Sequence, residues 1–177
     1  MNINTNNYGV NNSGLLEKNE RENIKYCPFC GVEGKYLKPE GKMFSVIPVS
    51  LDENTLVILD HAMKLEMFNS EFYTSAAKLA QTSDNKETFE ALSKIEKMHA
   101  IVHQKLGGFN ELPKLVPIDY SKHKSDKSLM KLAENREIHA VAFYEKYFKE
   151  ISNSIVKEVL VALSEVERGH IQIVKNY

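Results

Sequence analysis

Apolar side chains recur at helical spacing in four stretches of the chain, all of them after residue 50. One row, with steps of three and four residues, contains Leu59, Met63, Glu66, Ser70, Tyr73 and Ala77. A second row of the same form contains Met130, Glu134, Glu137, Val141, Tyr144, Phe148 and Ile151. Residues three or four apart lie on one face of a helix. Each row therefore predicts a helix whose apolar stripe faces a core and carries glutamates.

Capping signals set the expected limits of the first two helices. The sequence Ser-Leu-Asp-Glu at 50–53 has the form of a capping box, so the first helix is expected to start at Ser50 and to run to about residues 79–81. Asp84 is expected to open the second helix. The glycine pair at 107–108 is expected to end it.

A long connection separates the second predicted helix from the third. Residues 109–124 contain two prolines and no helical pattern. The third helix is expected over about 126–151, and after a break at 152–154 the fourth runs towards Tyr177. Short, long and short connections predict an all-α four-helix bundle made of two hairpins, with a long crossover between its second and third helices.

Three segments are expected along the chain. Residues 1–24 are rich in asparagine and lack periodicity, so they are expected to be a mobile N-terminal segment. Residues 25–49 form an extension that carries a Cys-x-x-Cys knuckle and a short stretch, 43–49, with the pattern of a strand. Residues 50–177 form the bundle.

Composition excludes several classes of partner. The net charge of -1 gives no reason to expect a nucleic acid or a membrane surface as partner. No apolar run is long enough to span a membrane, and no secretory signal is visible. We therefore expect a cytoplasmic protein in a reducing compartment, where cysteines more often bind metals or undergo redox reactions than form structural disulfides.

The bundle region contains an internal repeat with an offset of 71 residues. Two Glu-x-x-His motifs stand at this offset, and a further glutamate lies 30 residues before each of them. The six repeated positions are Glu66, Glu96, His99, Glu137, Glu167 and His170. One glutamate from each of two helices and Glu-x-x-His from each of the other two is the ligand set of bundles that hold two metal ions.

The chemistry of these side chains fits iron or manganese. A glutamate three residues before a histidine shares its helix face, so the carboxylate can bridge two ions while the imidazole binds one of them. Four carboxylates offset the charge of two divalent ions. Mixed oxygen and imidazole ligands with open positions suit iron or manganese better than a closed zinc site.

Four further residues near this set have open roles. Tyr73 and Tyr144 lie two turns from the glutamates of their own helices, so they either hydrogen-bond a carboxylate of an antiparallel neighbour or are plain core. Glu134 is one turn before Glu137 and is an alternative ligand, an extra carboxylate or a partly exposed side chain. His103, whose repeat partner is Val174, is expected to be structural or solvent-facing.

These residues resemble the rubrerythrin branch of the ferritin-like superfamily over roughly residues 50–177. The matching motifs are Ala-Met-Lys-Leu-Glu at 62–66 with Phe72-Tyr73, Glu-Lys-Met-His at 96–99, Glu137 with Phe143-Tyr144, and Glu-Arg-Gly-His at 167–170. The resemblance implies a ferritin-like bundle in which the six repeated residues bind non-haem di-iron. It also implies that the diferrous centre reduces hydrogen peroxide by giving up two electrons.

One position on the third helix departs from that family. Rubrerythrins carry an extra carboxylate three residues after the ligand of this helix, and here that position is Ala140. If Glu134 is the ligand, Glu137 becomes the extra carboxylate and the pattern is restored. The sequence leaves both assignments open.

The segment Cys27-Pro28-Phe29-Cys30-Gly31 resembles one knuckle of a rubredoxin or zinc ribbon. Such folds hold one metal with four thiolates, and the chain has two cysteines, so one chain cannot build that centre. Three readings remain. Two chains share a zinc or iron ion through pooled cysteines, other residues complete a site, or the thiols are a relic or a redox pair. If they are a relic, the electron donor is external.

We therefore expect a di-iron peroxide reductase that works with an external electron donor, with manganese as the other candidate metal. An iron-handling protein that oxidises ferrous iron with oxygen or peroxide is the alternative. A metal-binding redox sensor without enzymatic activity is the third hypothesis. By analogy with the family, a homodimer is expected.

Overall fold

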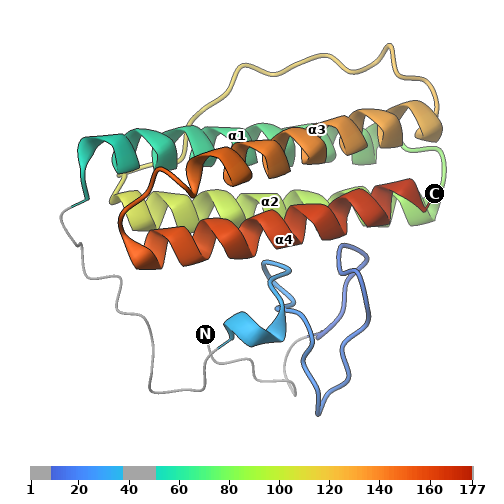
Figure 1. Cartoon of the computed structure of the whole chain (residues 1–177). Helices are drawn as coiled ribbons and strands as arrows, with labels where there is room; N and C mark the ends of the chain where they lie inside the picture. Colours follow the sequence, from blue (N-terminus) through green and yellow to red (C-terminus); the bar gives the residue numbers. More distant parts are fainter. Residues whose placement is uncertain (1–8, 38–50, 177) are drawn as a thin grey trace.

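The computed structural model describes residues 9–37 and 51–176, and four long helices dominate it (Figure 1). Their bounds are α1 Glu53–Leu79, α2 Ser83–Gly107, α3 Asp126–Tyr147 and α4 Ser154–Lys175, and a short 3-10 turn, η1, covers Gly34–Tyr36. No strand occurs within these two ranges, in which β-type pairing is limited to isolated bridges such as that between Tyr26 and Glu33. The all-α four-helix bundle predicted from the sequence is confirmed.

Helix starts differ from the predicted ones by one to three residues. The prediction that the first helix starts at Ser50 is wrong, because Asp52 is the N-cap of α1 and its Oδ1 accepts a hydrogen bond from the Thr55 amide at 2.8 Å. Thr82, not Asp84, caps α2, with its hydroxyl accepting from the Asn85 amide. Both caps have extended backbones, as N-cap residues require.

The later boundaries follow the same rules. Gly108 ends α2 in the left-handed conformation at φ 67°, as the glycine pair predicted. α3 ends at Tyr147, before the predicted 151, and its last turn is followed by a short non-helical segment. Asn153 then caps α4 through its Oδ1, which accepts from the amides of Ile155 and Val156.

Two antiparallel hairpins make the bundle. α1 packs mainly against α2, and α3 packs mainly against α4. The segment between α2 and α3 runs along the outside of the bundle from one end to the other (Figure 1). Arg136 on α3 fastens this crossover, because its guanidinium donates to the Tyr120 hydroxyl at 2.6 Å and lies over the ring of Phe72. The predicted long crossover is therefore present.

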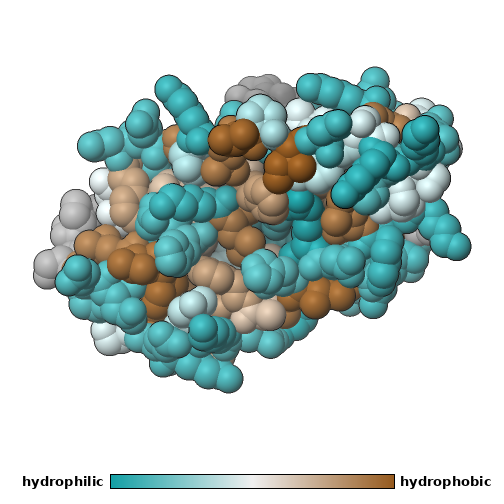
Figure 2. All heavy atoms as spheres, turned by 90° about the horizontal axis from the view of Figure 1, so that it is seen from above, coloured by the Kyte–Doolittle hydropathy of each residue, from teal (hydrophilic) through white to brown (hydrophobic). Residues whose placement is uncertain are grey.

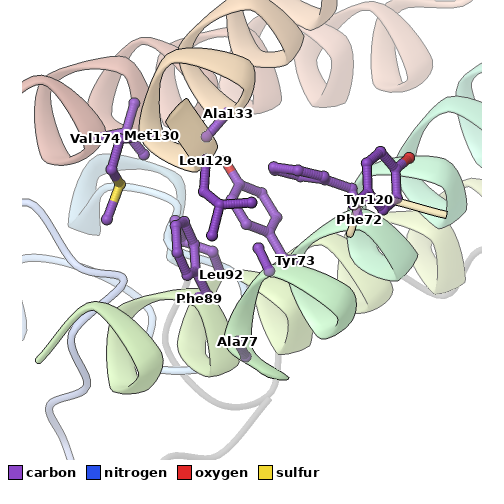
Figure 3. Close-up of a cluster of buried hydrophobic side chains, with 11 residues drawn as sticks. Phe72, Tyr73, Ala77, Phe89, Leu92, Tyr120, Leu129, Met130, Ala133 and Val174 are labelled. Atoms are coloured by element: carbon purple, nitrogen blue, oxygen red, sulfur yellow. The ribbon is translucent and has the colours of Figure 1, made fainter. Parts of the chain in front are cut away.

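The apolar core has two parts, one towards each end of the bundle. One cluster brings together all four helices and Tyr120 of the crossover (Figure 3). Its members are Phe72, Tyr73, Ala76, Ala77, Phe89, Leu92, Tyr120, Leu129, Met130, Ala133 and Val174. The other contains Ile58, Leu59, Ala62, Tyr144, Ile151, Val156, Leu160 and Leu163. On every helix the stretch between the two clusters carries a buried glutamate.

The N-terminal segment lies against α2 and α4 (Figure 1). Gly14 approaches Ile95 of α2, Gly31 approaches Val166 of α4, and Lys35 forms a 2.7 Å ion pair with Glu165. Asn19 links the loops of this segment, because its side chain donates to the carbonyls of Val10 and Tyr26. The mobility expected for residues 1–24 stays a prediction, and the strand expected at 43–49 lies outside the described residues.

The surface over α1, α3 and the crossover is mostly charged and polar, with small apolar patches between (Figure 2). Exposed apolar side chains on these elements include Phe68, Val116, Ile118 and Ile138. No helix in the described parts of the chain is both long enough and apolar enough to cross a membrane.

Candidate metal centre

The six repeated Glu and His residues lie together in the middle of the bundle. Each is at most 1% exposed. One comes from α1, one from α3, and two each from α2 and α4: Glu66, Glu137, Glu96 with His99, and Glu167 with His170. Their helices put them there because each glutamate continues the apolar stripe that faces the bundle axis. The prediction that Glu66 and Glu137 lie on buried stripes is therefore confirmed.

One half of the cluster is built around His99. Its Nδ1 lies 3.1 Å from Glu167 Oε1, 3.4 Å from Glu96 Oε2 and 4.0 Å from Glu66 Oε2. One ligand-type atom from each of these four residues lies within 4.8 Å of the others. The group therefore has the size and the donor atoms of a site for one metal ion.

The other half repeats this arrangement around His170. Its Nδ1 lies 2.9 Å from Glu96 Oε1, 3.0 Å from Glu167 Oε2 and 3.9 Å from Glu137 Oε2. These four residues form the second group that could hold an ion. Glu96 and Glu167 belong to both groups. In each of them one carboxylate oxygen lies near His99 and the other lies near His170. The sequence repeat thus becomes an approximate twofold symmetry of the site.

The cluster fits two divalent cations. Buried polar atoms normally have hydrogen-bond partners, yet in this cluster Glu66 Oε2, both oxygens of Glu96, His99 Nδ1, Glu137 Oε2 and Glu167 Oε1 have none of suitable geometry. A buried carboxylate without a partner or a cation is costly. Two divalent ions would satisfy these atoms and balance four carboxylates.

Burial and mutual repulsion distribute protons unevenly over the four carboxyl groups in the metal-free state. Burial, followed by the charges of Glu167 and Glu96, raises the pKa of Glu66 well above its ordinary value, and the pKa of Glu137 rises for the same reasons. Burial also acts to raise the pKa of Glu96 and Glu167. The charge of nearby His170 outweighs burial at Glu96 and lowers its pKa. At Glu167, the charge and hydrogen bond of His170 outweigh both burial and the charge of Glu96, so its pKa is also lowered.

The two histidines have raised pKa values. Burial favours the neutral imidazole, but the close carboxylates of Glu167 and Glu96 raise the pKa of His99 well above its ordinary value. The same balance raises the pKa of His170 to about 9. The carboxylates that surround each histidine therefore favour a positive charge at its position.

Two buried tyrosines hold the outer glutamates. Tyr73 of α1 donates a hydrogen bond to Glu137 of α3, and Tyr144 of α3 donates one to Glu66 of α1. The two pairs cross between antiparallel helices, as one reading of the sequence proposed. Both tyrosines are fully buried, and burial raises the pKa of each hydroxyl well above its ordinary value. They therefore remain neutral donors that orient the carboxylates.

Glu134 and His103 lie outside the cluster. Glu134 sits at the bundle surface, where it pairs with Lys131 at 2.6 Å and with Lys175 at 3.3 Å. His103 is fully buried and its Nε2 lies 2.8 Å from the Tyr144 hydroxyl. The structure thus brings Glu137, not Glu134, to the cluster. His103 is a structural residue, as one of the two readings proposed, and not a solvent-facing one.

The cysteine knuckle packs directly against this cluster, which the sequence pattern did not reveal. His99 Nε2 lies 2.8 Å from the carbonyl oxygen of Cys30, so the imidazole donates to that oxygen. The corresponding nitrogen of His170 has no hydrogen-bond partner among the described residues. No sequence signal identifies this contact, because it uses a backbone atom 69 residues away from His99.

The two thiols are free and adjacent. Cys27 is buried and Cys30 is half-buried. A hydrogen bond from the Cys30 thiol lowers the pKa of Cys27 to about 6, and the same bond, with burial, raises the pKa of Cys30. Within residues 9–37 and 51–176, neither cysteine belongs to a group of side chains that could hold a metal ion. Completion of a metal site by other described residues is therefore not observed.

Comparison with known proteins identifies the bundle. The family model described as the ferritin-like domain matches residues 54–177, which cover all four helices and all six residues of the cluster. No curated protein and no solved structure matches the chain.

Proposed function

The chain belongs to the ferritin-like family, and on that premise we propose that it binds two iron ions, or two manganese ions, and reduces hydrogen peroxide as rubrerythrins do. The electrons come ultimately from an external donor. This proposal combines the family with the resemblance of its motifs to rubrerythrins.

One observation carries the proposal: two four-residue groups share Glu96 and Glu167 and are fully buried. In the proposed centre, these two carboxylates would be ligands to both ions. His99 and Glu66 complete one coordination sphere. His170 and Glu137 complete the other. When bound, the two ions supply two electrons and polarise the peroxide.

The protein residues around the ligands prepare the site for this chemistry. Tyr73 and Tyr144 fix the outer carboxylates by hydrogen bonds from the facing helix. Apolar clusters on both sides of the site exclude water, which strengthens every electrostatic interaction inside. The ligands therefore hold their positions without reorganising around each change in charge.

Metal analysis with matched variants tests the binding site. Wild-type protein loaded anaerobically with ferrous iron should retain about two ions per chain. Glu167→Gln, which removes a shared carboxylate, should lose at least one of them. Glu158→Gln is the control, because Glu158 is exposed on the same helix. A wild-type protein that retains no iron would refute the proposed centre.

Peroxide assays then test the reaction. With a supplied electron donor, the wild type should reduce peroxide over many turnovers, and Glu167→Gln should not. Uptake of hundreds of iron atoms per assembly would instead support an iron-storage function. Stable metal binding without turnover would support the sensor hypothesis.

A further inference from the structure

We propose that Cys27 and Cys30 form a resident two-electron donor, a dithiol that returns electrons to the metal centre and becomes a disulfide. The proposal rests on the proposed function, since the electrons need an acceptor in the bundle. It deepens that function by assigning a route from the outside of the protein to the buried site.

The position of Cys30 is the first argument. Its carbonyl oxygen accepts a hydrogen bond from His99 Nε2 at 2.8 Å, and His99 Nδ1 lies 3.1 Å from Glu167. The connection from the Cys30 sulfur to the cluster therefore consists of the bonds of Cys30, one hydrogen bond and one imidazole ring. A hydrogen bond to the outer nitrogen of a ligand histidine also tunes the metal electronically.

The turn is held rigidly against the bundle. The Cys27 amide donates to the Val32 carbonyl at 2.8 Å, and the Gly31 amide donates to the Cys27 carbonyl at 2.9 Å. Gly31 has a φ of 71°, and a Cβ atom there would lie 2.9 Å from Val166 Cγ1 of α4. The backbone at Gly31 thus lies so close to α4 that a side chain would not fit. This close packing holds the Cys30 carbonyl oxygen within hydrogen-bond distance of His99.

The two thiols are arranged for a disulfide rather than for metal binding. Both are free thiols of one Cys-x-x-Cys turn, the spacing typical of redox-active dithiols. A metal shared with a second chain would need both sulfurs at the surface. Cys27 is only 4% exposed, so a partner chain cannot reach it without opening the turn.

Access from outside is through Cys30. A cavity of about 270 Å³ opens beside it, between the turn, α2 and α4, with Val102, Leu106 and Val159 on its walls. Cys30 lines this cavity and Cys27 does not, so a dithiol reductant that enters there would reach Cys30 first. Thiol–disulfide exchange at Cys30 would then release Cys27 and restore both thiols.

The electron balance of the step is simple. Two S–H bonds break, one S–S bond forms, and two protons and two electrons leave the cysteine pair. Each ion of the oxidised pair would take up one electron, and the two protons would balance the two that hydrogen peroxide takes up when it becomes two molecules of water. The oxidant of the cycle is hydrogen peroxide, whose reduction at the centre removes two electrons. The final reductant is an external dithiol.

A stepwise titration without added reductant tests the proposal. Ferrous-loaded wild type should consume two equivalents of peroxide per chain, one with electrons of the metal pair and one with electrons of the thiols. Mass spectrometry should then show a Cys27–Cys30 disulfide, with two hydrogen atoms lost and no alkylation by iodoacetamide after the protein is unfolded. Excess dithiothreitol should restore both thiols and, through them, the ferrous pair, so that the protein again consumes two equivalents.

Cys30→Ser provides the matched variant, because it removes the sulfur and keeps the carbonyl that faces His99. It should consume one equivalent of peroxide and bind the same amount of iron, and Cys27→Ser should behave in the same way. Circular dichroism melting checks that both variants are folded. Metal-free wild type is the control for direct oxidation of the thiols.

Three results would overturn the proposal. Thiols that stay fully alkylatable after two equivalents of peroxide are not donors. A disulfide that forms equally fast in metal-free protein does not deliver electrons to the centre. If the wild type binds an additional half metal ion per chain and Cys27→Ser loses only that half ion, the cysteines form a metal centre shared between two chains. By contrast, absence of any peroxide consumption, even with a supplied donor, would refute the proposed function itself.

Discussion

Tyr144 on α3 donates a hydrogen bond to Glu66 on α1, and the same hydroxyl oxygen lies 2.8 Å from His103 Nε2. Since the hydroxyl proton is directed to Glu66, the oxygen accepts the Nε2 proton of His103. Burial and the nearby charge of His99 lower the pKa of His103 to about 3, so its ring is neutral and carries its proton on Nε2. Glu66 is thus fixed by a chain of two hydrogen bonds.

The repeat-related tyrosine lacks the second bond of this chain. Tyr73 donates to Glu137 in the same way, but the position that corresponds to His103 is Val174, which belongs to the same buried cluster as Tyr73. The two halves of the site therefore contain the same types of ligand, but only the Glu66 half has a histidine that hydrogen-bonds the supporting tyrosine.

Tyr144→Phe should destabilise the protein more than Tyr73→Phe. Both variants lose a hydrogen bond to a glutamate, but only Tyr144→Phe leaves the buried Nε2–H of His103 without an acceptor. An unsatisfied buried donor costs about 1–3 kcal/mol. We expect the free energies of unfolding in urea, measured on metal-free protein, to differ by about 1 kcal/mol or more in this direction.

A double variant controls for this explanation. His103→Val copies the other half of the repeat, and in the Tyr144→Phe background it removes the orphaned donor. Replacing both partners by apolar groups is often close to neutral. The double variant should therefore recover part of the stability lost in Tyr144→Phe. Additive losses would show that His103 and Tyr144 are not coupled.

Much of this architecture could be predicted from the sequence, because the same pattern of glutamates and histidines occurs in both halves of the bundle region. The apolar rows around Glu66 and Glu137 predicted buried glutamates, since a carboxylate on a stripe that faces the core is shielded from solvent. The Glu-x-x-His spacing placed Glu96 beside His99 and Glu167 beside His170. The family match to residues 54–177 agrees with this fold.

Other features depend on geometry that the sequence does not specify. Glu134 and Glu137 share one row in the helical pattern. The way α3 packs decides that Glu134 lies at the surface, where it pairs with Lys131 and Lys175. The capping box at residues 50–53 predicted a start at Ser50. The hydrogen bonds of Asp52 to the amide and hydroxyl of Thr55 decide the start of α1.

Glu137→Gln and Glu134→Gln should separate the two candidate carboxylates of α3. Glu137 lies in one of the two metal groups, whereas Glu134 pairs with two lysines at the surface. We expect Glu137→Gln to lose metal at the His170 half of the site and Glu134→Gln to bind about as much as wild type. Elemental analysis after desalting measures both. Equal losses in the two variants would reopen the assignment of Glu134 as a ligand.

Two glycines should respond to alanine in opposite directions. Gly31→Ala puts a side chain at φ 71° and 2.9 Å from Val166, so we expect a loss of about 1–2 kcal/mol or more from backbone strain alone. Gly169→Ala lies inside α4, and its Cβ would meet only Leu16 at 3.9 Å. There we expect a gain of about 0.5–1 kcal/mol from helix propensity.

Thermal melting of both variants provides the comparison. Gly31→Ala should also weaken the contact between Cys30 and His99, which would appear as faster alkylation of the buried Cys27. Normal stability and normal protection of Cys27 in Gly31→Ala would contradict the close approach of the turn to α4.

Metal loading should release protons, because cations replace them in the cluster. Without metal, the raised pKa values of Glu66, Glu137, His99 and His170 favour the protonated form of each group. As ligands, all four carboxylates are ionised and both imidazoles are neutral. We therefore expect protons to leave as divalent ions bind.

The direction of the pH dependence follows from the same shifts. A group with a raised pKa in the folded state stabilises that state fully below its unfolded pKa, and this contribution is lost as pH rises through the folded pKa. For His170, the window extends from about 6.5 to about 9. Metal-free protein should therefore melt at lower temperature as pH rises through this window, whereas metal affinity should increase. Titration in a weakly buffered indicator solution counts the protons, and metal binding without any proton release would contradict the raised pKa values.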